Sequence, residues 1–124
     1  MAKVLVIDDE EGIRNLLDTL LRRNGYDVVL AASCQRGLEL LRRERPDVLE
    51  LDLNMPGMSG LTVLQQVRSL TPQQPVIILT GAGTPEVEQQ VRALGVTEFV
   101  EKEFSLHLLG DALQRILSHP DRST

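Results

Sequence analysis

Five short β-rich runs alternate with helical patterns along this chain, and this alternation constrains the possible fold more than any other feature. The runs are KVLVID at 3–8, YDVVLA at 26–31, DVLELD at 47–52, PVIILT at 75–80 and TEFVEK at 97–102. Strands separated by helices at this spacing predict parallel strands joined by crossover helices. We therefore predict an α/β domain with a doubly wound sheet of five parallel strands and five helices.

The segments between the runs carry helix signals. Apolar residues recur at the spacing of a one-faced helix at Ile13, Leu16, Leu17, Leu20 and Leu21, and again at Leu109, Leu113, Ile116 and Leu117. Asn24-Gly25, Pro46 and Gly95 are placed where helices are expected to end, and Ser59 is expected to cap the start of another.

Length and composition exclude several classes of protein. A chain of 124 residues suits one domain, which we assign to 1–118, followed by a polar tail at 119–124. The net charge of -5 argues against direct binding of nucleic acid. No stretch approaches the roughly 20 apolar residues of a membrane span, and the N-terminus enters a strand pattern at once. The single cysteine, Cys34, excludes an internal disulfide and is interpreted as a packing residue. We expect a cytoplasmic protein without membrane insertion.

Polar residues follow the ends of several predicted strands. VLVI runs directly into four carboxylates, DDEE at 8–11, while Asp52, Thr80 and Lys102 end later strands. Parallel strands place these ends at one edge of the sheet, where open α/β sheets bind ligands. Strand order cannot be read from the sequence, but neighbouring first and third strands would bring Asp8, Asp9 and Asp52 together.

Carboxylates that lie this close require a cation or a shared proton. Oxygen ligands suit Mg²⁺, which binds one or two carboxylates and keeps several waters. Lys102 could pair with a carboxylate or a phosphoryl oxygen, and Thr80 offers a hydroxyl donor. A carboxylate nucleophile with these groups suits phosphoryl transfer.

These residues resemble the receiver domain of two-component response regulators over nearly the whole chain. The matching stretches are VLVIDDEE, DLNMPGMSG, VIILTGAG and FVEKEF, in the same order and at the same strand ends. The resemblance implies a flavodoxin-like fold with strand order 2-1-3-4-5. It also implies a signalling switch that assists its own phosphorylation and dephosphorylation rather than an enzyme with an external substrate.

The resemblance assigns a role to each matching position. Asp52 would be the phosphoacceptor. Mg²⁺ would be held by Asp9 directly, by Asp8 largely through water, by Asp52, and by the backbone carbonyl of Asn54. Thr80 and Phe99 would be the switch residues, and Lys102 would pair with the phosphoryl group. Glu10 and Glu11 we interpret mainly as charges that favour a helix N-terminus.

The implied partners are a sensor histidine kinase or phosphotransfer protein, and a downstream output protein or domain. Output would pass through the fourth helix, fifth strand and fifth helix. No output segment follows Leu117, so we expect a stand-alone regulator or a receiver cut from a longer chain.

Two positions depart from the family pattern. Glu103 stands where a proline usually follows the lysine, and we predict a trans Lys102–Glu103 peptide because a non-proline cis bond costs about 2.5–4 kcal/mol. Glu50 stands where receivers usually carry an apolar residue, and we expect it to lower stability without blocking phosphorylation.

Two other functions remain open from the sequence. A pseudo-receiver would keep the fold as a constitutive protein-interaction module, and only Glu50 and Glu103 favour it. A Mg²⁺-dependent phosphatase with an aspartate nucleophile would need a second acid two residues after Asp52, where Asn54 stands.

Overall fold

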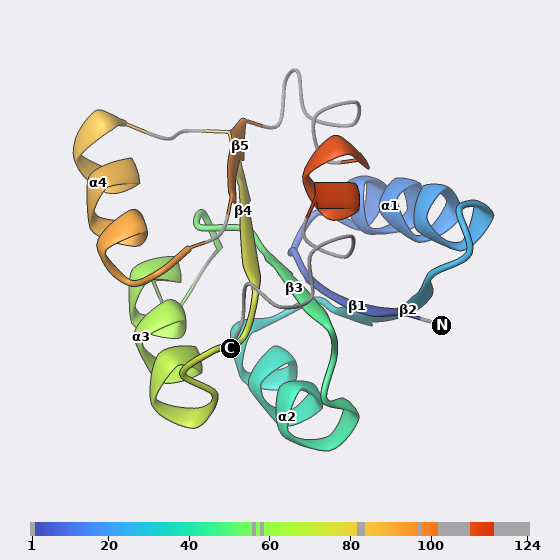
Figure 1. The fold of residues 1–124 in the computed structure, drawn as a ribbon, viewed down its shortest axis with the longest axis horizontal. Coiled ribbons are helices and arrows are strands. Elements are labelled where there is room, and N and C mark those ends of the chain that lie inside the picture. The colour runs from blue at the N-terminus through green and yellow to red at the C-terminus, as the bar shows by residue number, and fades with distance from the viewer. Residues whose placement is uncertain are drawn as a thin grey trace.

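The computed structural model describes residues 2–55, 57, 59–81, 84–96, 98–101 and 110–115. Five strands form one parallel sheet in the order β2-β1-β3-β4-β5, as the resemblance implies (Figure 1). The elements are β1 (Lys3–Ile7), α1 (Glu11–Arg23), β2 (Asp27–Ala31), α2 (Cys34–Glu44), β3 (Val48–Leu51), α3 (Gly60–Leu70), β4 (Val76–Thr80), α4 (Pro85–Ala93) and β5 (Glu98–Glu101). A further helical segment covers 110–115. The predicted fold class is confirmed, whereas the predicted boundary at residue 118 lies outside the described residues.

Helices cover both faces of the sheet, and each face has its own core. Alternate strand residues such as Leu5, Leu49 and Ile78 pack under α2, α3 and α4. The residues between them, such as Val6 and Ile77, pack under α1 and the helical segment 110–115 (Figure 1). Because both faces are covered, all five positions of β4 are buried, which explains its continuous apolar run.

The helix boundaries follow from capping residues. Ser33, Ser59 and Thr84 each accept a hydrogen bond from the backbone three residues on, and the predicted capping role of Ser59 is confirmed. Helices α1, α2 and α4 end beside the predicted Asn24-Gly25, Pro46 and Gly95. One expected core position differs: Leu16 lies at the margin of the apolar stripe of α1 and is 40% exposed.

The sheet has two functionally different edges. The C-terminal ends of the strands, with the loops that follow them, form what we call the site edge. The starts of the strands and the C-termini of the helices form the opposite edge. Helices α1 to α4 all carry arginine in their last turn, where a cation interacts favourably with the helix dipole.

Arg68 of α3 joins three segments at the opposite edge. Its guanidinium donates to the carbonyls of Leu94 (2.5 Å) and Gly95 (2.8 Å) after α4, and to that of Gln74 (2.7 Å) before β4. Partial burial lowers the pKa of Arg68 from its usual value. Each guanidinium nitrogen thus donates one hydrogen bond to a carbonyl, and these bonds fix the end of α4 relative to α3.

Candidate functional site

The pairing of β1 with β3 brings two acids together at the site edge. Ile7 lies opposite Leu51, so the next residues, Asp8 and Asp52, follow on adjacent strands. The amide of Asp52 donates to the carbonyl of Ile7 at 3.0 Å, which extends the ladder by one step. Both acids are buried, with exposed fractions of 0% and 1%. Two carboxylates are therefore held side by side with little access to water.

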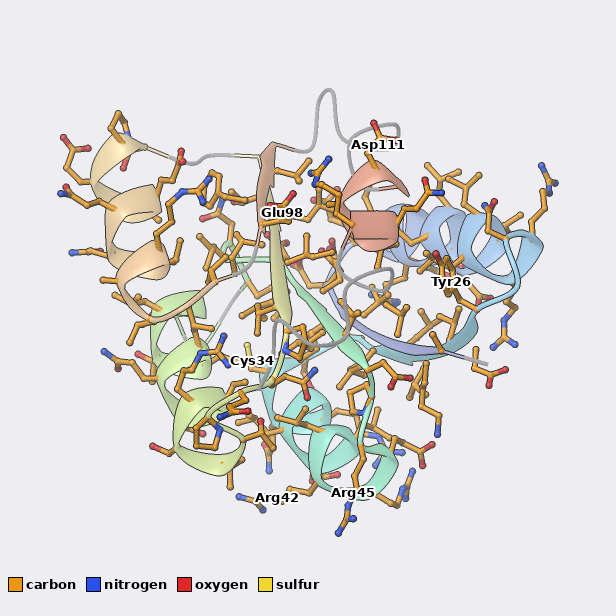
Figure 2. The ribbon with its side chains drawn as sticks, in the orientation of Figure 1. Tyr26, Cys34, Arg42, Arg45, Glu98 and Asp111 are labelled. Carbon is orange, nitrogen blue, oxygen red and sulfur yellow. The ribbon has the colours of Figure 1, made fainter. Side chains whose placement is uncertain are left out.

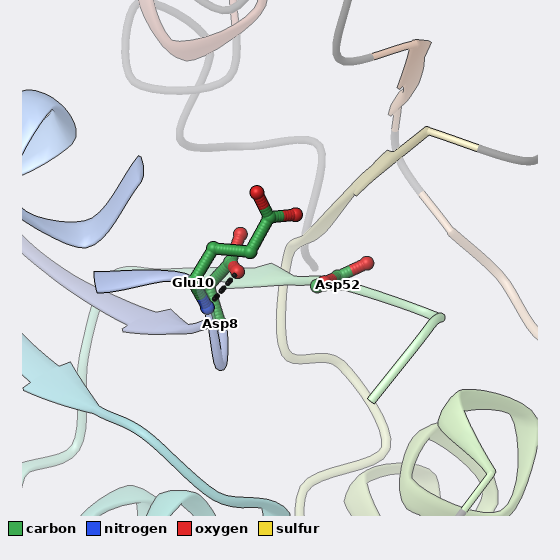
Figure 3. A group of neighbouring side chains, drawn as sticks. All are labelled: Asp8, Glu10 and Asp52. Carbon is green, nitrogen blue, oxygen red and sulfur yellow. Dashed lines mark hydrogen bonds between the residues drawn. The ribbon is translucent and has the colours of Figure 1, made fainter. Parts of the chain in front are cut away.

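A third carboxylate, that of Glu10, joins this pair. One oxygen from each of Asp8, Glu10 and Asp52 lies within 4.8 Å of the others (Figure 3). The backbone amide of Glu10 donates to Asp8 Oδ1 at 2.9 Å, so the chain turns tightly after β1 and brings the Glu10 side chain back over the site. Like charges this close repel one another unless a cation lies between them, and three carboxylate oxygens suit a hard divalent ion such as Mg²⁺.

Asp9 is placed differently from its neighbours. It is exposed and is not part of the group that Asp8, Glu10 and Asp52 form. Its assignment as a direct metal ligand, like that of the Asn54 carbonyl, stays a prediction. Sequence reasoning missed Glu10, which we interpreted as a helix-terminal charge. Glu10 does occupy the N-cap of α1, but its side chain makes no capping hydrogen bond and belongs to the carboxylate group instead.

Asn54 links the predicted phosphoacceptor to the predicted switch hydroxyl. Its backbone amide donates to Asp52 Oδ1 at 3.0 Å, and its side-chain Nδ2 donates to Thr80 Oγ1 at 2.9 Å. Thr80 is the last residue of β4 and is fully buried, whereas Asn54 itself is exposed. One residue of the β3–α3 loop therefore contacts the strand ends of both β3 and β4.

The loop after Asp52 is held against α3 by a close approach at Gly60. A Cβ at this position would lie 2.5 Å from the Cα of Leu53. Only glycine allows the first residue of α3 to lie this close to the backbone after β3. Ser59 and Gly60 therefore serve capping and close packing, respectively, at the site edge.

The remaining predicted site residues lie on and after β5. Phe99 is half-buried, lies opposite Ile78 of β4, and packs against the core under α2, α3 and α4. Lys102 and the Lys102–Glu103 peptide lie outside the described residues, so the predicted trans bond stays a prediction.

Cys34 lies close to the site, at the first position of α2. Burial raises the pKa of its thiol, and the negative charges of Asp52 and Asp9 raise it further. The thiol therefore stays protonated at neutral pH, which agrees with the packing role expected from the sequence.

Glu50 is buried on the face that α1 covers. It pairs in register with Val6 and Ile77, and it is 1% exposed. Its side chain therefore does not lean out toward solvent. A carboxylate at this depth is costly unless other groups compensate for it.

Comparison with known proteins identifies the class of this protein. The response regulator receiver domain family matches residues 4–114, and the chain belongs to that family. The chain is 33% identical to the sporulation initiation phosphotransferase F of Bacillus subtilis, over 93% of each chain. It is 34% identical to the transcriptional regulatory protein AfsQ1 of Streptomyces coelicolor, but it spans only 55% of that protein's length.

Solved structures show the same fold. The chemotaxis protein CheY4 of Vibrio cholerae superposes with a TM-score of 0.87 at 36% identity, covering 94% of this chain and 98% of its own. The response regulator TrrA of Thermotoga maritima, solved in complex with Mg²⁺-BeF, superposes with a TM-score of 0.83 at 29% identity, covering 94% of this chain and 99% of its own. Receiver domains of this family bind Mg²⁺ at an acidic pocket, and this chain carries the group of Asp8, Glu10 and Asp52.

Proposed function

We propose that this receiver domain is a Mg²⁺-dependent phosphoacceptor switch, in which Asp52 takes a phosphoryl group from a phosphohistidine. The donor is a sensor histidine kinase or a phosphotransfer protein of the cytoplasm. The observation that carries the proposal is the grouping of Asp8, Glu10 and Asp52 within 4.8 Å, with Asn54 connecting Asp52 to Thr80. Family membership and the Mg²⁺-BeF complex of a relative support it.

Each site residue has a separate role in the proposed phosphoryl transfer. An Asp52 carboxylate oxygen attacks phosphorus while the phosphorus–nitrogen bond to the donor imidazole breaks, and the imidazole keeps the electron pair. Bound Mg²⁺ would neutralise charge that develops on the phosphoryl oxygens. Asp8, Glu10 and Asp52 would hold the ion, together with Asp9 and the Asn54 carbonyl as the resemblance implies. In this proposal Lys102 pairs with the transferred group.

The same residues supply a means of switching. After transfer, the phosphoryl oxygens are strong hydrogen-bond acceptors for the Thr80 hydroxyl, whose oxygen accepts from the Asn54 side chain before transfer. Thr80 then moves toward Asp52, and Phe99 follows it inward from β5. The changed surface spans α4, β5 and the helical segment 110–115, where a downstream output protein or domain would bind. The purpose of the domain is signalling, not turnover of an external substrate.

Intact mass measurement tests the phosphoacceptor directly. The protein is incubated with Mg²⁺ and acetyl phosphate, in parallel with Asp52→Asn and with a sample containing chelator. We expect the wild type alone to gain one phosphoryl group. A gain that persists in Asp52→Asn would assign the acceptor to another residue.

Calorimetric titration with Mg²⁺ distinguishes the proposed phosphoacceptor switch from the alternative function, a pseudo-receiver. If the wild type binds Mg²⁺ but gains no phosphoryl group, the protein is a pseudo-receiver that acts as a constitutive interaction module. We expect Asp8→Asn to weaken Mg²⁺ binding by at least tenfold, because it removes a charge from the buried pair, while Glu39→Gln on the exposed surface of α2 leaves binding unchanged.

A further inference from the structure

A hollow at the opposite edge has no part in the function proposed above. It lies between the C-termini of α2 and α3 and has a volume of about 470 Å³. Leu41 and Pro46 are buried beneath it, while Leu70 at the end of α3 borders it and is 39% exposed. Leu70 is one of only two large hydrophobic residues exposed to this extent among the described residues.

Two arginines make the hollow cationic. Arg42 and Arg45 both line it and are exposed, and Figure 2 shows both side chains at the C-terminal end of α2. In the part of the chain that the structure describes, neither has a carboxylate partner. Several other arginines do form ion pairs with carboxylates, namely Arg22, Arg36, Arg43, Arg92 and Arg115. Two exposed cationic side chains thus line one hollow of a chain whose net charge is -5.

The backbone places Arg45 in an unfavourable conformation. Its φ of 48° lies in the left-handed region, where glycine is the usual residue after a helix. Pro46 follows directly, and a residue before proline favours an extended conformation. An arginine therefore occupies a position at which glycine would make the fold more stable. The exposed Leu70 lines the same hollow.

The floor of the hollow is preformed. The side-chain amide of Gln74 is buried and donates to the carbonyls of Pro46 (3.3 Å) and Pro75 (3.2 Å). These bonds connect the loop before β3 to the loop before β4. A ligand would therefore meet a surface whose shape needs little reorganisation.

We propose that this hollow docks a short acidic peptide segment of a partner protein. One apolar side chain of the segment would contact Leu41 and Leu70, and flanking carboxylates would pair with Arg42 and Arg45. Charge complementarity favours an acidic ligand, and the exposed leucine favours one that also carries an apolar side chain. The net charge of the whole chain opposes an extended polyanion such as nucleic acid. Because the hollow lies at the edge away from Asp52, docking is independent of Mg²⁺ and phosphorylation.

Fluorescence anisotropy with a labelled acetyl-Asp-Glu-Leu-Asp-Glu-amide peptide tests the proposal. We expect saturable binding that weakens with added salt and is the same with Mg²⁺ or chelator. Arg42→Gln/Arg45→Gln should weaken it by about fivefold or more. Arg23→Gln is the matched control, because it removes an exposed arginine from the last turn of α1, outside the hollow. Its affinity should stay within twofold of the wild type.

The variant Arg45→Gly distinguishes a role of Arg45 in docking from a role in stabilising the fold. It should raise the melting temperature by about 3 °C, since glycine fits the left-handed conformation, and yet weaken peptide binding. A merely structural role for Arg45 would not move the two measurements in opposite directions. The proposal is overturned if the peptide does not bind, if the double variant binds it as well as the wild type, or if a peptide with serine in place of leucine binds equally. It is also overturned if single-stranded DNA of equal charge binds more tightly.

Discussion

The two edges of the sheet are built from the same strands and helices but use their polar groups in opposite ways. At the site edge, the buried Asp8 and Asp52 lie beside Glu10, so like charges are kept together. At the opposite edge, Arg68 donates to three carbonyls and so links three segments. In a parallel sheet the helix N-termini and C-termini gather at different edges, and the dipoles favour anions at the first and cations at the second. The polar contacts of Arg68 hold segments together at the opposite edge, whereas the site edge keeps three carboxylates together where a cation can bind.

The largest expected effect on stability comes from Arg68→Met, which keeps the apolar stem and removes three hydrogen bonds. We expect the free energy of unfolding to fall by about 3 kcal/mol and the melting temperature by about 10 °C, while phosphoryl uptake by Asp52 is retained. Arg92→Met is the control, since it removes only an exposed pair with Glu88 and should cost under about 1 kcal/mol. Equal effects of the two variants would refute a special role for Arg68.

Glu50→Leu tests the residue that lies between the two edges. We expect it to raise the free energy of unfolding by about 2 kcal/mol, because well-packed apolar residues often replace buried charges with a gain. Urea denaturation measures the change, and phosphoryl uptake should persist. Glu50→Gln is the matched control, because it removes the negative charge without adding an apolar side chain. It should give the smaller gain in the free energy of unfolding. A loss of stability in Glu50→Leu would show that the carboxylate makes a net favourable interaction.

Asn54→Ala should show the reverse of Arg68→Met: little change in stability and a clear change in switching. Loss of the hydrogen bond to Thr80 Oγ1 releases the hydroxyl for a phosphoryl-like ligand. On the proposed function, the beryllofluoride concentration at half-saturation should fall about fivefold, as measured by NMR titration. Asn24→Ala, which removes another asparagine amide donor at the end of α1, should not change it. An unchanged midpoint in Asn54→Ala would mean that this bond does not restrain the switch.

The smallest expected effect concerns the ion pair between Lys3 and Glu44 at the opposite edge. The hydrogen bond from Lys3 Nζ at 3.2 Å, followed by the positive charge of Lys3, lowers the pKa of Glu44 below its ordinary value of 4.5. A lowered folded-state pKa contributes stability above the unfolded pKa, and this is lost as pH falls through the folded value. Glu44→Gln should therefore melt slightly lower than the wild type at pH 7. The two melting curves should converge at pH values well below 4.5, and a difference that persists there would exclude the ion pair as its cause.

Local patterns were sufficient to predict the class of fold and most of its elements. The five apolar runs, the helical periodicities and the Asn24-Gly25, Pro46 and Gly95 signals depend on backbone geometry within a few residues. The same holds for the capping role of Ser59. The exposure of Leu16 was not predictable in this way, because spacing defines an apolar stripe but not how far the sheet beneath it extends.

Tertiary structure alone decided which of the four consecutive carboxylates gather with Asp52. The turn at Asp8 brings Glu10 to the group and leaves Asp9 exposed, a result that depends on the hydrogen bond from the Glu10 amide to the Asp8 carboxylate. The bond between Asn54 and Thr80 joins residues 26 positions apart, and the hollow at Arg42 and Arg45 needs two helix ends to meet. The sequence by itself determined which chemistry the chain carries at its strand ends, because residue types and strand periodicity are local. Contacts between distant segments arise only when the strands pair, so the structure alone determined the partners of these groups.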